Sequence, residues 1–201
     1  RLQAPSSGTV SGALSGPHPG LAAPSIYDPG MPEQPDASRA DAMTPRCPPP
    51  KEAPPDSGKV FVLGVSGASG APYAVRVLEQ VLMSGATVHC VVSEYGQRLL
   101  FDELGVKKVE LAQLCPNLVE SPAAAGEFGS RFIAHPNKDV GAVIASGSFL
   151  HDGMAVLPCS STSLGAIATG AGSNLLTRAA MVTLKERRPL IVCHREMPLN
   201  L

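Results

Sequence analysis

The sequence predicts an α/β domain with a doubly wound parallel sheet of the flavodoxin-like or Rossmann-like kind, with helices on both faces. Two observations lead to this fold class. Short apolar runs rich in β-branched residues recur through residues 58–201, and amphipathic helical patterns stand between them. Such alternation is typical of parallel strands, because each crossover between them needs a helix or a long connection.

Five apolar runs are predicted as strands. The first carries the letters KVFVLGV and the second TVHCVV, and both are continuous enough for strands buried on both faces. The predicted strands cover residues 59–65, 87–92, 139–145, 154–157 and 190–193.

Four segments carry apolar residues at helical spacing. In residues 71–83 these positions fall on one face of a helix, which predicts that this face packs on the sheet. By contrast, residues 112–138 contain three prolines and few periodic signals, so we expect a variable connection there. The predicted helices cover residues 71–83, 94–104, 163–169 and 175–187.

Residues 1–57 differ in composition from the rest of the chain. They hold 13 of the 20 prolines, and proline disfavours helices and central strands because it lacks a backbone donor and fixes φ. We therefore predict a disordered tail rich in Pro, Gly, Ala and Ser, followed by a folded domain over residues 58–201. The first 27 residues contain no acid, so a targeting segment is the alternative. The expected compartment is the cytoplasm, with a mitochondrion or another organelle as the alternative.

Charge and composition argue against several classes of protein. The chain has 16 Lys and Arg residues against 17 Asp and Glu residues, which argues against nucleic-acid binding by bulk charge. No apolar run is long enough for a membrane span. The five cysteines form no CxxC pair, which argues against a zinc site or a disulfide framework and fits a reducing compartment.

Small and hydroxyl-bearing residues follow most of the predicted strands. Ligands of a parallel sheet bind where its strands end, so these residues form the candidate site. Glycines let backbone amides approach a ligand, and hydroxyls with helix N-termini bind phosphate without net charge. The pattern predicts one phosphorylated, aromatic ligand across these ends. The segments are residues 66–70 (SGASG), Ser93, residues 146–148 (SGS), residues 158–163 (PCSSTS) and residues 194–196 (HRE).

These segments also have simpler interpretations. A small-residue turn between a strand and a helix is common, and Ser93 and residues 160–163 fit helix N-caps. The sequence contains neither a GxGxxG motif nor a Walker phosphate loop. His135, His151 and His194 lack the spacing of metal ligands, so we expect them to be structural or solvent-exposed.

Several charged residues could bind an anion. Arg178 and Lys185 stand two helical turns apart, so a helix places both on one face. Two cations repel there unless they share an anion, which a phosphate or a neighbouring acid could supply. Arg195 and Glu196 form either a surface ion pair or a phosphate-binding arginine beside a proton-moving carboxylate. For residues 187–188 we expect exposed side chains that complement the helix dipole.

Five segments together resemble the UbiX-type flavin prenyltransferases. They occur in the order and spacing of that family, and the resemblance spans residues 59–201. The turn GASG is unspecific alone, whereas PCS followed by RAA, LKERRPL and RE-x-P is highly specific. The segments are residues 64–70 (GVSGASG), 145–149 (ASGSF), 153–160 (GMAVLPCS), 174–188 (NLLTRAAMVTLKERR) and 195–199 (REMPL).

The resemblance implies an enzyme that binds FMN and needs no metal. Such enzymes transfer a dimethylallyl group from dimethylallyl phosphate to reduced FMN, and the prenylated FMN serves UbiD-type decarboxylases of ubiquinone and aromatic-acid pathways. The family is usually assembled as a dodecamer built from trimers. The implied partners are therefore dimethylallyl phosphate, further copies of this chain and a UbiD-type decarboxylase, with no nucleic acid and no membrane span.

The resemblance also implies site residues by position. It places FMN contacts at Gly67, Ala68, Ser69, Ser93, Ser160, Ser161, Thr162, Ser163 and Arg195. It implies catalytic roles for Ser69, Glu103, Arg178, Lys185 and Glu196. Of these, the last three surround the dimethylallyl phosphate, and Glu103 is supplied across a subunit interface. Fixed cations near a leaving phosphate stabilise its growing charge.

One departure from the family pattern bears on activity. Family members continue past RE-x-P for about 45–50 residues, and that tail adds a Tyr and a basic residue around the donor phosphate. We expect a C-terminally truncated chain to keep FMN binding better than prenyl transfer. Two alternatives stay open. One is a flavin-dependent cysteine decarboxylase, which the absence of His from residues 93–104 disfavours, and the other is a non-catalytic FMN-binding remnant.

Overall fold

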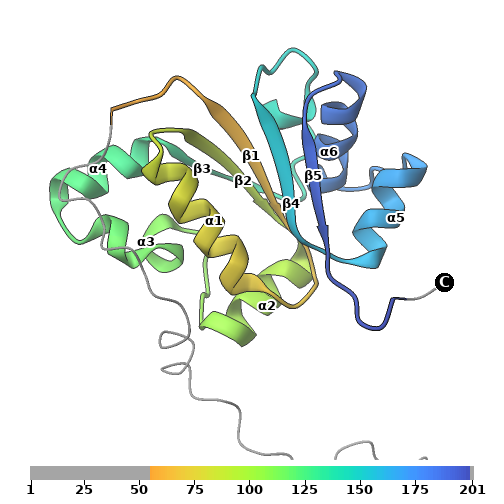
Figure 1. Cartoon of the computed structure of the whole chain (residues 1–201), viewed down its shortest axis with the longest axis horizontal. Helices are drawn as coiled ribbons and strands as arrows, with labels where there is room; N and C mark the ends of the chain where they lie inside the picture. The colour runs from red at the N-terminus through yellow and green to blue at the C-terminus, as the bar shows by residue number, and fades with distance from the viewer. Residues whose placement is uncertain (1–54, 200–201) are drawn as a thin grey trace, which may run out of the picture. The chain divides into compact units, whose positions relative to one another are not determined.

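The computed structural model describes residues 55–199. The tail predicted over residues 1–57 therefore lies almost wholly outside the described residues, as do residues 200–201. The described part is an α/β fold built on one parallel sheet (Figure 1).

The sheet has five strands with the first strand at its centre. From one edge to the other the strands are β3 (Phe132–Pro136), β2 (Thr87–Val92), β1 (Val60–Val65), β4 (Gly153–Cys159) and β5 (Leu190–His194). The chain adds β2 and β3 on one side of β1 and then crosses back to add β4 and β5 on the other. The switch point of this doubly wound order lies between β1 and β4, where sheets of this kind bind ligands.

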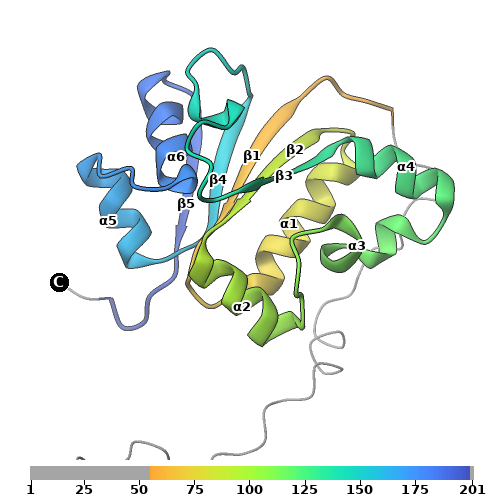
Figure 2. The same ribbon diagram turned by 180° about the vertical axis from the view of Figure 1, so that it is seen from behind.

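Helices cover both faces of the sheet, which confirms the predicted fold class (Figures 1 and 2). One face carries α1 (Ala71–Met83), α2 (Glu94–Leu104), α3 (Leu111–Leu114) and α4 (Pro122–Ser130), and the other carries α5 (Ser161–Thr169) and α6 (Leu175–Lys185).

Alternate residues of the strands supply two separate cores. On β2, Val88 and Cys90 belong to the core under α1–α4, whereas Val91 belongs to the core under α5 and α6. This division follows from the period of two along a strand. Phe128 of α4 is fully buried and anchors the helices of the first core.

The third strand is not where the sequence predicts it. Residues 139–145 form a loop and the 3-10 turn η3 (Val143–Ala145), whereas β3 lies inside the predicted variable connection. That connection also holds α4 and the 3-10 turn η2 (Pro116–Val119). Because β3 is an edge strand whose side chains are exposed or half-buried, it carries no continuous apolar run. Ile144 and Ala145 are buried instead by packing of η3 against α6.

The other predicted elements are confirmed with small shifts in their bounds. The helices over 71–83 and 94–104 and the strand over 87–92 begin and end where the sequence predicts. Helix α5 begins earlier than predicted, at Ser161, and α6 ends earlier, at Lys185. Strand β4 continues to Cys159.

Helix α1 takes its N-terminal cap from another helix. Gly70 holds the N-cap position with a φ of 122° and offers no side chain to cap with. Instead, the carboxylate of Glu103 on α2 accepts hydrogen bonds from the backbone N–H of Gly70 at 3.1 Å and of Ala71 at 2.8 Å. A carboxylate at this place also meets the positive end of the helix dipole. The contact fixes α2 against the turn that follows β1.

Three histidines, from β2, β3 and the loop before β4, lie close to one another and to Phe149. Nδ1 of His89 lies 2.9 Å from Nε2 of His135, and the two rings stack with 5.1 Å between centroids. The ring of Phe149 lies 4.7 Å from that of His89 and 6.0 Å from that of His151. Burial, and then the charges of the other two histidines, lowers the pKa of His89 from 6.5 to about 4. The environment of His89 therefore favours the neutral form of its imidazole over the charged form.

The cap on α1 can be tested by replacing Glu103 with Ala. We expect a loss of about 1–3 kcal/mol in the free energy of unfolding, because two helix N–H groups lose a charged acceptor. Asp102→Ala is the matched control, since Asp102 lies next along α2 and pairs with the exposed Arg98 at 2.8 Å. It is expected to cost less than about 0.5 kcal/mol. Urea denaturation followed by circular dichroism measures both, and equal losses would contradict the cap.

The histidine cluster predicts that stability falls as the pH drops from about 6.5 towards 4. In that window the unfolded chain protonates His89, whereas the pKa of about 4 keeps it neutral in the folded protein. Acid therefore favours the unfolded chain. His89→Gln is expected to flatten the dependence of the urea midpoint on pH between pH 7 and pH 5. Parallel curves for the variant and the unmodified chain over that interval would refute this expectation.

Candidate functional site

The carboxyl ends of the strands meet at one open cleft. Its volume is about 510 Å³, which is within the range of pockets that hold small ligands. The cleft is lined by the turns after β1, β2, β3 and β4 and by the start of α6, so it lies around the switch point of the sheet. Five residues with predicted FMN contacts line it together: Gly67, Ser93, Ser160, Thr162 and Ser163.

Six further lining residues are absent from the predicted site: Glu94, Tyr95, Asn137, Lys138, Ser173 and Asn174. Asn137 and Lys138 follow β3, so they escape notice once that strand is misplaced. Asn174 stands directly before a predicted helix, and its identity as a good N-cap residue was the signal that could have found it.

Three helix N-termini face the cleft through their capping residues. Ser93 caps α2 by accepting from the N–H of Gly96 at 3.0 Å, and Ser160 caps α5 by accepting from the N–H of Ser163 at 3.3 Å. Asn174 caps α6. The simpler interpretation of Ser93 and Ser160 as N-caps is therefore confirmed, and the same residues line the cleft. The positive ends of the helix dipoles converge there, which favours an anion.

The N-terminus of α6 already has its partners within the protein. The backbone oxygen of Asn137 accepts from the N–H of Leu175 at 2.9 Å, and its side-chain Oδ1 accepts from the N–H of Leu176 at 3.1 Å. These bonds tie the end of β3 to α6. Because Oδ1 of Asn137 accepts from Leu176, the NH₂ group of the same amide is available to donate a hydrogen bond to a ligand. Helices α2 and α5 are consequently the better donors to a ligand.

A buried hydroxyl joins the turns after β1 and β4. Ser66 is fully buried, and its Oγ donates to the carbonyl of Pro158 at 3.0 Å. The same Oγ accepts from the N–H of Ser160 at 2.8 Å. Ser66 thereby fixes the N-cap of α5 relative to the glycine turn after β1.

The mouth of the cleft carries a close backbone contact and one exposed ion pair. A Cβ at Gly67 would collide with the Cβ of Tyr95, so only glycine fits this turn. Nζ of Lys138 lies 3.1 Å from Oε1 of Glu94, and both side chains are largely exposed. Such a pair contributes little to stability. Lys138 can therefore exchange its carboxylate partner for an anionic ligand at small cost.

Other predicted site residues lie near the cleft without lining it. Ala68 is buried, and Ser69 is exposed on the turn before α1. Arg195 is exposed beyond β5, where its backbone N–H donates to the carbonyl of Cys159 at 2.9 Å. Ser161 is the first residue of α5, and its hydroxyl donates to Oε2 of Glu196 at 2.9 Å. The segment after β5 is thus tied to the helix whose start lines the cleft.

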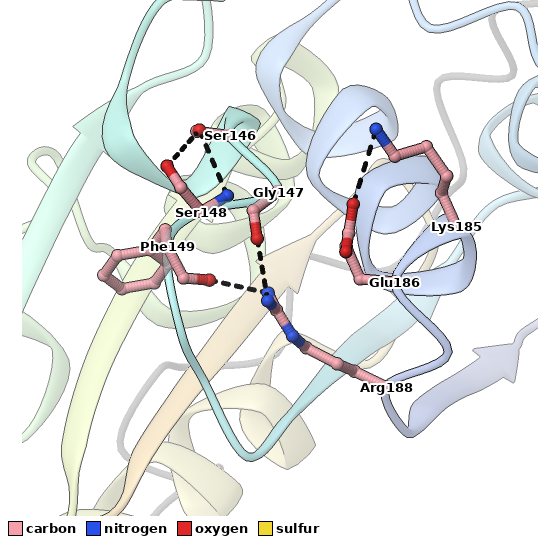
Figure 3. A network of polar contacts seen from close by, with 7 residues as sticks. All are labelled: Ser146, Gly147, Ser148, Phe149, Lys185, Glu186 and Arg188. Atoms are coloured by element: carbon pink, nitrogen blue, oxygen red, sulfur yellow. Dashed lines mark hydrogen bonds and ion pairs between the residues drawn. The ribbon is translucent and has the colours of Figure 1, made fainter.

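The two predicted cations of α6 do not both reach this cleft. Lys185 ends the helix whose first turn borders the cleft, which places it about 15 Å along the axis from that turn. Its Nζ lies 3.4 Å from Oε1 of Glu186, so a neighbouring acid is present (Figure 3). Arg178 is exposed near the start of the helix. Glu103 lies on α2, where it caps α1.

The loop over residues 146–149 is organised by Arg188. Its guanidinium donates to the carbonyls of Gly147 at 2.8 Å and Phe149 at 2.6 Å (Figure 3). Two sequence-based expectations are wrong here. The segment SGS follows η3 and not a strand, and Arg188 is half-buried against a loop and is not an exposed partner of the helix dipole.

Two classes of feature are missing from residues 55–199. No group of three or more His, Cys, Asp or Glu side chains in this range is arranged to hold a metal ion. No helix in the same range combines the length and the apolar character that crossing a membrane requires.

Comparison with known proteins gives consistent results. The flavoprotein family matches residues 51–200. The flavin prenyltransferase UbiX of Halalkalibacterium halodurans is 39% identical over 141 residues, which are 70% of this chain and 66% of that protein. The chain thus spans just under two thirds of the length of that curated relative.

Two crystal structures are similar in fold and in sequence. AnUbiX (PadA1) in complex with FMN and dimethylallyl pyrophosphate is 30% identical with a TM-score of 0.56, over 71% of this chain and 67% of that one. A dodecameric FMN-dependent UbiX-like decarboxylase from Escherichia coli O157:H7 is 34% identical with a TM-score of 0.54, over 70% of this chain and 68% of that one. The chain therefore belongs to the flavoprotein family and, within it, to the UbiX-like flavin prenyltransferases.

Proposed function

We propose that the chain is a flavin prenyltransferase, which transfers the dimethylallyl group of dimethylallyl phosphate to reduced FMN. The observation that carries the proposal is the convergence of the Ser93 and Ser160 helix caps on a cleft lined by hydroxyl and amide groups. Further support comes from a relative named as a flavin prenyltransferase and from a similar structure that holds FMN with dimethylallyl pyrophosphate.

The residues of the cleft fit FMN. Hydroxyl and amide side chains suit the ribityl hydroxyls, and the first turns of α2 and α5 together with Lys138 suit the phosphate. Gly67, which also lines the cleft, lets the turn after β1 pack closely against Tyr95. Reduced FMN supplies the nucleophilic ring atoms to which the prenyl group attaches.

The chain's own residues then bind the two substrates and manage a proton. Arg195 would contact the phosphates from the segment after β5. Glu196, tied to α5 through Ser161, would give a proton to the phosphate as its bond to the allylic carbon breaks. The contacts of Ala68 and Ser69 with FMN and the catalytic roles of Ser69 and Glu103 stay predictions.

We propose that the active form is a homo-oligomer. Helix α6 carries Lys185 away from the cleft of its own chain, so Lys185 would serve the donor phosphate at the cleft of a neighbouring copy. Arg178, in the first turn of α6, would serve the donor phosphate from near the cleft of its own chain. The dodecameric state named for the E. coli protein supports such an assembly. The product would pass to a UbiD-type decarboxylase. Thiols at Cys90, Cys159 and Cys193 fit a reducing compartment, for which we propose the cytoplasm.

Mass spectrometry of the flavin tests the activity. The full chain, incubated without oxygen with FMN, dithionite and dimethylallyl phosphate, is expected to yield flavin heavier by one prenyl unit. The control omits dimethylallyl phosphate. A folded, FMN-loaded protein that leaves the flavin mass unchanged would contradict the proposal and favour an FMN-binding remnant. Release of CO₂ from a cysteinyl peptide would favour a cysteine decarboxylase.

Because Ser66 shapes the cleft, we predict that removing its hydroxyl lowers both the stability of the fold and the affinity for FMN. Ser66→Ala leaves the N–H of Ser160 without its buried acceptor, so we expect a loss of about 1–3 kcal/mol in the free energy of unfolding. FMN affinity, measured by quenching of flavin fluorescence, is expected to fall roughly tenfold. Ser130→Ala is the control, because that exposed hydroxyl donates to the carbonyl of Glu127 at 2.8 Å, far along the chain from the cleft. Unchanged FMN affinity in Ser66→Ala would disprove the link.

A further inference from the structure

A serine at the edge of the cleft connects a histidine to the proposed proton donor. Oγ of Ser161 lies 2.9 Å from Nε2 of His194, and it donates to Oε2 of Glu196, also at 2.9 Å. Ser160 and Thr162, on either side of Ser161 in the chain, both line the cleft. The three linked side chains therefore lie directly beside the place where the substrates would bind.

The backbone explains why His194 and Glu196 meet the same hydroxyl. His194 is the last residue of β5, and Glu196 follows it by two residues, so both stand within reach of the start of α5. The intervening Arg195 donates its N–H to the carbonyl of Cys159, which keeps the segment beside the end of β4. Ser161 follows β4 by two residues, so the two strand ends bring the hydroxyl and its partners together.

The single proton of the hydroxyl gives the network a direction. When Ser161 donates to Glu196, its oxygen can only accept from His194, so Nε2 of the imidazole carries a proton. A hydroxyl that accepts on one side and donates on the other can pass a proton without a change of position. His194, expected from the sequence to be structural or solvent-exposed, is thus joined to the carboxylate.

We propose that His194 and Ser161 form a relay that returns a proton to Glu196 after each transfer, an inference that rests on the proposed function. Glu196, left as a carboxylate, takes the Oγ proton of Ser161, and Ser161 takes the Nε2 proton of His194. Nδ1 of His194 takes a proton from solvent, so the ring ends neutral with its proton on Nδ1. Exchange with solvent then returns the ring to the form protonated on Nε2, which resets the relay for the next transfer. In total, one proton passes from solvent to Glu196, and no group is oxidised or reduced. His194 and Ser161 are positioning residues, because they act through Glu196.

Substitutions that separate hydrogen bonding from proton transfer test the relay. His194→Gln keeps an N–H donor for Ser161 but cannot carry a proton through its side chain. We expect kcat to fall roughly tenfold or more, while KM for dimethylallyl phosphate and Kd for FMN stay within about twofold. Ser161→Ala should lower kcat to a similar extent, and Ser161→Thr, which keeps the hydroxyl, should recover kcat to within about threefold.

A double variant of Glu196 and His194 shows whether the two residues act in one pathway, and a distant variant serves as the control. In a Glu196→Gln background, adding His194→Gln should cost no further activity, because the relay serves only Glu196. Thr169→Ala, at the opposite end of α5, where the hydroxyl donates to the carbonyl of Gly165, should leave activity unchanged. Independent, additive losses from Glu196→Gln and His194→Gln, or wild-type kcat in His194→Gln, would overturn the relay.

A second readout needs no flavin. NMR of protein labelled with ¹⁵N-histidine is expected to show His194 with a proton on Nε2 that exchanges slowly with water. Ser161→Ala should speed this exchange roughly tenfold or more. Unchanged exchange would overturn the relay even in an active enzyme. An unmodified chain that leaves the flavin mass unchanged would instead overturn the proposed function and the relay with it, so the two failures are distinguishable.

Discussion

The hydroxyl of Ser66 joins the turn after β1 to the turn after β4, and the geometry of the cleft depends on this join. The two turns come from distant parts of the chain, and only the doubly wound order of the sheet makes them neighbours. The hydroxyl of Ser66 is the acceptor for the N–H of Ser160, whereas the carbonyl of Pro158 also accepts from the backbone N–H of Ser66 at 3.1 Å. One side chain thus sets the spacing between the glycine turn and the N-cap of α5.

The cleft attracts an anion with little net charge of its own. Its one lining cation, Lys138, is matched by the lining carboxylate of Glu94, and the chain as a whole carries a formal charge of −1. The attraction comes instead from the N-termini of α2 and α5, whose dipoles are fixed by the fold. A cleft without net charge can bind a phosphate through oriented N–H groups and hydroxyls.

The sequence reveals those parts of the site that follow continuous apolar strands. Gly67, Ser93 and Ser160 come after β1, β2 and β4, whose buried runs are visible without the structure. Asn137 follows β3, an edge strand that is only partly buried and therefore leaves no apolar run to find. The contact of Glu103 with α1 depends on how two helices pack, and no spacing within one helix encodes it.

The carboxylate of Glu103 also restricts which nucleotides the fold can accept. In sheets that bind dinucleotides, the helix after the first strand receives the pyrophosphate at its N-terminus. That end of α1 already holds an anion, with the N–H groups of Gly70 and Ala71 committed to it. A pyrophosphate placed there would meet like charge and occupied donors. The N-terminus of α1 is therefore occupied by a carboxylate of the same chain, at the place where dinucleotide-binding sheets hold a pyrophosphate.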